Sequence, residues 1–325
     1  EYEDATGIDA GASTNELLSG GAYIGGSAVS APTGATSTDT SVAGYTTHVL
    51  SASSGSLVVG GSLTVDILVV AGGGSGGGDL AGGGGAGGLI YKPSHALTAQ
   101  TYAWVTGAGG AGQSGDALGN NGSDSTWTDA SANVEFTASG GGGGGYPSGN
   151  GRDGGSGGGA SHISTSGGSE NQSGEAGDSA TYGFGFDGGD CVSGSTGGGG
   201  GAGGAGGTTA SGSLSGAGGL GKDYSAIFGT AVGDSGWFAS GGGGGYSGTN
   251  STASSGGGTA SDGYTSPTAS AAANTGGGSA GGSSSHGDSG AGGSGIILVR
   301  HANTNILDLT LQSTDTTAST ANPDY

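Results

Sequence analysis

The segment Val65-Asp66-Ile67-Leu68-Val69-Val70-Ala71 leads directly into the glycine run GGGSGGGDLAGGGGAGG at residues 72–88. A second apolar segment, Ile296–Val299, follows the small-residue stretch GAGGSG at residues 290–295. Short apolar runs bounded by turn-forming residues are typical of buried strands. We therefore predict that the two segments belong to one small β region, which brackets the glycine-rich residues between them.

The composition limits the classes of protein that this chain can belong to. It has 89 glycines in 325 residues and a net charge of −21, with only four lysines and arginines. This much glycine without a Gly-X-Y period is not collagen, and composition alone would suggest disorder. Regularly placed aromatic anchors such as Trp104, Trp127 and Trp237 argue against a disordered linker. The acidic balance argues against binding to nucleic acid or to anionic membrane surfaces.

Further features bear on the cellular context. No apolar run approaches eighteen residues, so we predict no membrane insertion. The single cysteine, Cys191, rules out an intramolecular disulfide framework. The chain lacks methionine and begins at Glu1, so we expect a processed product or a piece of a longer protein.

Short β signals lie on both sides of the first bracketing segment. Tyr45–Leu50 and Ser56–Val59 precede it, and Thr101–Val105 follows it with alternating aromatic or apolar and small residues. We divide the chain into a β-rich N-terminal region (1–64), a glycine-rich domain (65–301) and the start of a further β module or linker (302–325).

Two stretches of the glycine-rich region resemble each other. Phe136-Thr137-Ala138-Ser139 enters the run at 140–145 and then Tyr146, whereas Phe238-Ala239-Ser240 enters the run at 241–245 and then Tyr246. Each has an aromatic anchor, a bridge of small residues, a glycine run and a tyrosine. Such self-similarity indicates one structural device used twice.

The glycine runs require a source of stability other than side chains. Ordering the backbone of one residue costs about 1–2 kcal/mol, and glycine loses the most freedom. Extended left-handed helices with three residues per turn have no internal hydrogen bonds, so they can bond to neighbours on all sides. We predict a mainly irregular and β fold, with packed polyglycine type II helices bracketed by short strands and β-rich pieces at both ends. Alanine and serine interruptions are expected on faces that the helices do not share.

Several of these motifs together resemble a known family. The segments VDILVVAGGGSGGG, GGGGAGGLIY, TYAWVTGAGGAG, NGSDSTW and GGSGIILVRH are similar to the glycine-rich domain of bacteriophage tail-fibre and adhesin proteins. The separated polyglycine runs also resemble the distal adhesin of T-even-type long tail fibres. The resemblance covers about Val65 to His301.

This resemblance implies a polyglycine sandwich whose loops bind receptors on the host surface. It implies a structural or receptor-binding module of a virion fibre, whose partners are a glycan or outer-membrane protein of the host, other fibre or virion proteins, and in some cases further copies of the chain. An alternative from another class is a subunit of a secreted cell-surface or matrix filament. An ice-binding protein is a third reading, although the sequence lacks a regular threonine grid.

We find no motif that predicts catalysis or a cofactor. Gly216–Lys222 has the spacing of a phosphate-binding loop, but Asp223 follows where serine or threonine should hold Mg²⁺. The serine-protease-like sequence Gly233-Asp234-Ser235-Gly236 recurs in kind elsewhere, which is typical of turns. Histidines are unpaired in sequence and acidic residues are spread singly, so we predict neither an enzyme nor a metal site.

Recognition is therefore expected from the loops. Tyr182-Gly183-Phe184-Gly185-Phe186 alternates rings with glycine, and a strand would place all three rings on one face. That face could pack over glycine or form a platform for a ligand. The expected receptor-binding residues, chosen as aromatic and adaptable polar side chains of the connecting loops, are Tyr146, Asn150, Arg152, Tyr182, Phe184, Tyr246, Asn250 and Tyr264.

Overall fold

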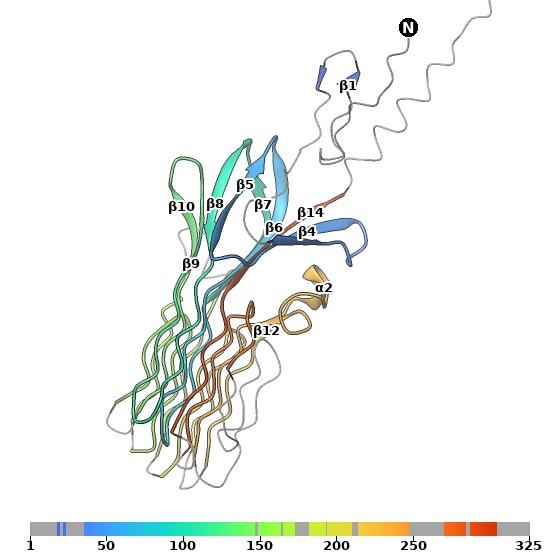
Figure 1. Cartoon of the computed structure of the whole chain (residues 1–325). Helices are drawn as coiled ribbons and strands as arrows, with labels where there is room; N and C mark the ends of the chain where they lie inside the picture. The colour runs from blue at the N-terminus through green and yellow to red at the C-terminus, as the bar shows by residue number, and fades with distance from the viewer. Residues whose placement is uncertain are drawn as a thin grey trace, which may run out of the picture.

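The structure, a computed structural model, describes residues 18–19, 22–23, 36–146, 149–163, 165–172, 182–192, 194–209, 214–246, 270–283 and 287–303. The described chain is rich in antiparallel strands and nearly free of helix. It forms a two-sheet sandwich from which a bundle of extended segments continues (Figure 1). Among the described residues, no helix is long and apolar enough to span a membrane.

The larger sheet has six strands and is built around the two bracketing segments. Its order is β11-β7-β6-β14-β4-β3. Strand β14 pairs antiparallel with β6, so that Val70 lies opposite Ile296 and Leu68 opposite Leu298. This confirms the prediction that the two apolar segments share one β region. The strands are β3 (Thr36–Asp39), β4 (Tyr45–Leu50), β6 (Leu63–Val70), β7 (Leu89–Leu97), β11 (Gly183–Phe184) and β14 (Ile296–Ala302).

The smaller sheet has four antiparallel strands in the order β10-β9-β8-β5. These are β5 (Ser54–Val59), β8 (Gln100–Val105), β9 (Ser125–Thr128) and β10 (Val134–Ala138). Strand β5 pairs with β8, and β4 pairs with β14. The described strands between residues 36 and 59 are thus integral to both sheets. A separate two-residue pair joins β1 (Leu18–Ser19) and β2 (Ala22–Tyr23).

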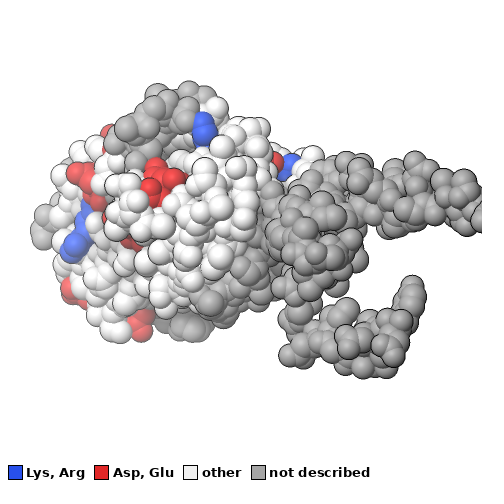
Figure 2. All heavy atoms as spheres, turned by 90° about the horizontal axis from the view of Figure 1, so that it is seen from above, with Lys and Arg blue, Asp and Glu red and all other residues white. Residues whose placement is uncertain are grey.

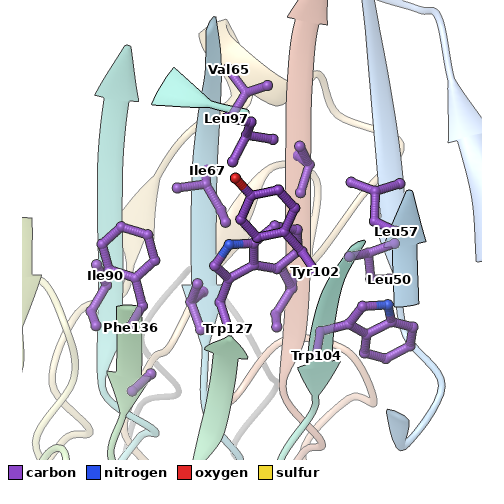
Figure 3. Close-up of a cluster of buried hydrophobic side chains, with 14 of the residues drawn as sticks. Leu50, Leu57, Val65, Ile67, Ile90, Leu97, Tyr102, Trp104, Trp127 and Phe136 are labelled. Carbon is purple, nitrogen blue, oxygen red and sulfur yellow. The ribbon is translucent and has the colours of Figure 1, made fainter. Parts of the chain in front are cut away.

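A hydrophobic core fills the space between the two sheets. Alternate residues of β8 and β9 point inward, which buries Tyr102, Trp104 and Trp127. They meet β6 side chains such as Ile67 in one cluster (Figure 3). The rings of Tyr102 and Trp127 stack with their centroids 5.2 Å apart. This core is held by side-chain burial in the ordinary way.

The other face of the six-stranded sheet has its own cover. Residues 222–239 form β12 (Lys222–Asp223), the one-turn helix α2 (Ser225–Phe228) and β13 (Trp237–Phe238). Phe228 and Phe238 pack there with Leu68 in a second cluster. Arg300 of β14 bonds to Asp66 at 2.9 Å and donates to the carbonyl of Ile227, which ties the cover to the sheet.

Beyond the strands, the glycine-rich segments between residues 72 and 295 form neither α-helices nor β-ladders. We call these packed segments the array. Their hydrogen bonds to neighbouring segments recur every three residues. Gly72, Ser75 and Gly78 donate to the carbonyls of Ser123, Asn120 and Ala117, at 2.8–3.0 Å. A repeat of three with all bonds directed outward is the geometry of the polyglycine type II helix.

The segment 81–88 lies at the centre of this array. Its residues donate in turn to three neighbours, 276–282, 139–145 and 197–200. It accepts from three others, 71–77, 156–159 and 242–245. Gly82 to Gly85 are all buried. The prediction that the glycine runs are ordered and extended is therefore confirmed for the described runs.

The expectation for the alanine and serine interruptions is wrong for several of them, although Ala205 is exposed as expected. Ser75, Ser279 and Ala86 are fully buried, so they do not lie on outer faces. The Ser279 hydroxyl accepts from the Gly76 N–H at 2.9 Å and donates to the carbonyl of Gly290. A hydroxyl can thus replace a backbone partner inside the array. Ala86 lies where the array meets the sheet, and it packs in the second cluster.

Candidate functional site

The array presents a set of turns at the end opposite the sandwich. The segments 72–78 and 81–88 run antiparallel, with Gly88 bonded to Ala71 beside the sheet and Gly82 bonded to Gly77 at the far end. Asp79 and Leu80 make the turn between them, with φ of 52° and 44°. We call this end of the array the tip; in Figure 1 it lies at the bottom.

The structure brings Tyr146 and Tyr246 to the tip together. Gly145 accepts from Gly82, and Gly245 donates to Ala81, so the two tyrosines follow residues that flank one turn. Both side chains are half-buried. Desolvation raises the pKa of the Tyr146 phenol, and a hydrogen bond to the Asp116 side chain adds to the rise. The tyrosine at this point is therefore neutral at physiological pH.

Asn150 also lies near the tip, but its side chain has a structural partner. Its Oδ1 accepts from the backbone N–H of Ser166 at 3.2 Å, and Asp153, three residues on, accepts from Ser169 at 2.7 Å. The spacing of three matches the repeat of the extended helix, so both oxygens meet one neighbouring segment. Asn150 thus fixes the edge of the array.

The same arrangement occurs at two further places. Asn121 and Asp124 accept from Gly143 and Gly140 at 2.9 and 2.7 Å. Asp187 and Asp190 accept from Glu170 and Gly167 at 2.8 and 2.9 Å. The segments are NGSD, NGRD and DGGD. We call each such pair an Asx clamp, since its two side-chain oxygens accept backbone N–H groups of one neighbouring segment.

The clamp formed by Asp187 and Asp190 has a third carboxyl group beside it, that of Glu170. A hydrogen bond between the Glu170 and Asp187 side chains raises the pKa of Glu170 and lowers that of Asp187. Glu170 therefore takes up a proton at a higher pH than Asp187 does.

In the part of the chain that the structure describes, no group of three or more histidine, cysteine or acidic side chains could hold a metal ion.

Arg152 lies between Asn150 and Asp153, the two members of one Asx clamp. Its backbone carbonyl accepts from Gly158 at 2.9 Å, and its N–H donates to Gly143 at 2.8 Å. The residue is exposed. Its guanidinium therefore faces solvent from the side of the array and remains a candidate contact.

The rings of Tyr182 and Phe184 lie far from the tip, and the predicted single ring face is wrong. Strand β11 places Phe184 opposite Leu89, at the sheet edge. Tyr182 packs against the inter-sheet cluster and Phe184 against the cluster on the other face. Lys92 Nζ lies 4.6 Å from the Tyr182 ring centre and Lys222 Nζ 3.6 Å from that of Phe184. Both rings are used for packing and cation–π contacts. Strand β11 is only two residues long and does not include Tyr182, so it does not hold the two rings on one face.

Sequence reasoning missed three aliphatic residues at the tip. Ile163, Val192 and Leu214 are exposed by 53%, 50% and 44%. Their turns are hydrogen-bonded neighbours, since Gly194 donates to His162 and Thr196 donates to Leu214. The signal that could have found them is an isolated aliphatic residue among small polar ones between glycine runs. The predicted residues Asn250 and Tyr264 lie outside the described residues.

The tip therefore combines two half-buried tyrosines and exposed aliphatic side chains on turns held by a stiff array. A family model described as a glycine-rich domain matches residues 51–302. A search of curated proteins found no match.

Proposed function

This chain belongs to the glycine-rich domain family, and we propose that it is a structural, receptor-binding module of a bacteriophage fibre. The tip contacts the host cell surface, and the sandwich joins the module to the rest of the fibre. The proposed module works by binding and carries out no chemical reaction.

The observation that carries this proposal is the separation of the two ends. Strand β14 runs from the array at Ile296 to Ala302, and Asn303 bonds to Gly44 at the remote end of the sandwich. This contact lies at one end of the described molecule, and the tip turns lie at the opposite end (Figure 1). An attachment end and a free end joined by a rigid body suit a fibre component.

The array supports this role because it fixes the turns without taking part in recognition. Its interior glycines have no side chains and cannot distinguish ligands, whereas the turns can vary without disturbing the backbone lattice. Tyrosine supplies a rigid contact area at low entropic cost. The net charge is −21, and acidic side chains lie at several places on the face shown in Figure 2. Long-range attraction to an anionic cell surface is therefore unfavourable, so contact at the tip is short-range.

Adsorption of the purified protein to a panel of bacterial cells tests the proposal. We expect Tyr146→Ala combined with Tyr246→Ala to abolish cell binding, because both tyrosines lie beside one tip turn. The matched control is Phe186→Ala. Phe186 is an exposed ring, 41% accessible, on the flank of the array, and its loss should leave binding unchanged.

The outcomes distinguish receptor binding at the tip from the alternative function, a subunit of a filament. If the double variant binds cells as well as the parent does, the tyrosines are not the contact. If the parent binds no cell type but assembles into filaments, a cell-surface or matrix filament subunit becomes the better reading.

A further inference from the structure

The outer face of the four-stranded sheet has an unusual composition for this protein. Alternate residues of β5, β8, β9 and β10 point away from the core, and the register places them in rows. The face, which we call the valine–threonine face, consists of the rows Ser54–Val105–Thr126–Thr137, Ser56–Ala103–Thr128–Val134 and Val58–Thr101.

No residue of this face is ionisable, although the chain as a whole carries −21. The nearest carboxylates lie at its margins and have other partners. Asp129 accepts hydrogen bonds within its own turn, from Ser131 and Asn133. Glu135 sits at a bulge in β10 and bonds to His95 of the other sheet at 3.1 Å.

The same face holds three large apolar side chains that remain accessible. Val58, Val105 and Val134 are exposed by 44%, 45% and 52%. Between them lie small residues and threonines, whose methyl groups add apolar area. The largest contiguous apolar patch on a typical monomer, about 300–600 Å², is often an interaction site.

We propose that the valine–threonine face associates with the same face of a second copy of this chain. Charge identifies the partner. Two strongly acidic molecules repel each other wherever carboxylates meet, so they can approach closely only through surfaces without charge. A two-fold arrangement pairs identical patches, and flat sheets of small side chains pack face to face at about 10 Å. The proposal is independent of what the tip binds.

The dimensions set the strength of this contact. Strands are spaced about 4.8 Å apart and rise about 3.3 Å per residue, so the face covers roughly 300 Å² per copy. Stable interfaces bury about 800 Å² per partner. The dimer is therefore weak and forms at high protein concentration. Salt strengthens it, because the Debye length shortens from about 30 Å at 0.01 M to about 8 Å at 0.15 M and screens the repulsion.

Sedimentation velocity of the full chain at low and at physiological ionic strength tests this inference. We expect the parent to be monomeric at low salt and to shift towards dimer as salt or protein concentration rises. Val105→Lys places a charge within the face, on one of its two inner strands, and should remove the shift. Val192→Lys is the matched control, since Val192 is about equally exposed but lies at the tip; it should behave as the parent does.

Thermal unfolding of each variant confirms that it is folded, and Thr101→Lys, at another exposed position of the face, replaces Val105→Lys if that variant is not. A parent that stays monomeric at every salt concentration would overturn the proposal. So would a dimer that Val105→Lys and Thr101→Lys leave intact, or one that Val192→Lys disrupts equally. Loss of cell adsorption in tip variants bears on the proposed function alone.

Discussion

The sandwich and the glycine array are two interiors built on opposite principles within one chain. Between the sheets, large side chains such as Trp127 and Ile67 are fully buried. The removal of their apolar surface from water drives the packing. In the array, most of the buried groups are backbone amides and carbonyls, which bond largely to neighbouring segments. One interior is filled by side chains and the other depends on their absence.

This difference decides which amino-acid substitutions each region tolerates. A hydrophobic core accepts exchanges of similar volume, because apolar contact has no fixed direction. The array has no such freedom, since its hydrogen bonds are directional and neighbouring backbones lie in contact. A Cβ added at Gly143 would lie 2.1 Å from the carbonyl oxygen of Gly119. We therefore expect single methyl groups to distinguish the two regions.

The largest effect is expected from Gly143→Ala. The β-carbon cannot fit unless two backbone segments separate, which breaks several hydrogen bonds at once. We predict a loss of at least about 5 kcal/mol in unfolding free energy, comparable to the whole stability of many domains. Gly204→Ala is the control, because its β-carbon would have Leu220 N at 3.9 Å as its nearest neighbour. Similar thermal midpoints for the two variants would contradict a close-packed backbone lattice.

In the sandwich, Trp127→Ala should destabilise the protein by about 3–5 kcal/mol through loss of buried area and formation of a cavity. Trp127→Phe should cost far less. The indole N–H has no hydrogen-bond partner among the described residues, so the smaller ring loses area but leaves no unpaired polar group. Urea unfolding measures both changes. Equal losses for the two variants would show that the sandwich is as intolerant as the array.

Acid should weaken the sandwich through a histidine pair. His48 of β4 and His301 of β14 lie with their Nε2 atoms 3.3 Å apart. Burial, with His301 adding to it, lowers the pKa of His48 from 6.5 to about 4. The unfolded chain therefore binds the proton more readily, and stability present above pH 6.5 is lost as the pH falls towards 4. The loss is on the order of 3 kcal/mol.

Unfolding measured between pH 7 and pH 4 checks this expectation. His48→Gln should flatten the pH dependence over that range, because glutamine does not titrate. An unchanged slope in this variant would assign the effect to other groups.

The smallest effect is expected at the Asx clamps. Asp124→Ala removes the acceptor of the Gly140 N–H and should cost about 1.5–3 kcal/mol, the usual range for a hydrogen bond to a charged group. Ser123→Ala, in the same clamp segment with its residue exposed, is the control. Hydrogen exchange should then rise locally at 140–143, and uniform exchange across the array would argue against local clamping.

The sequence predicted the parts of the fold that depend on local pattern. The apolar runs around Val70 and Ile296 indicated paired strands, since such runs must be buried. Alternation at Thr101–Val105 predicted β8. The glycine runs indicated extended helices, because only backbone hydrogen bonds and contacts could offset the entropy lost when glycine becomes ordered. The tyrosines after residues 145 and 245 were expected at turns, and the described structure places both there.

What the sequence did not predict depends on which segments become neighbours. The hydrogen bond of the Asn150 side chain to Ser166, sixteen residues away, cannot be deduced from local pattern. The rings of Tyr182 and Phe184 were given one face because a longer strand was assumed.

By itself, then, the sequence determined that this chain has paired apolar strands and an ordered, glycine-rich interior, since hydrophobic burial and glycine's missing Cβ are properties of the residues. The tertiary structure alone decided which six segments surround residues 81–88, which serines enter the array and which aliphatic residues gather at the tip. Glycine runs are nearly identical to one another, so their order in the lattice is set by the lengths and anchors of the connections between them and by the long-range hydrogen bonds that result.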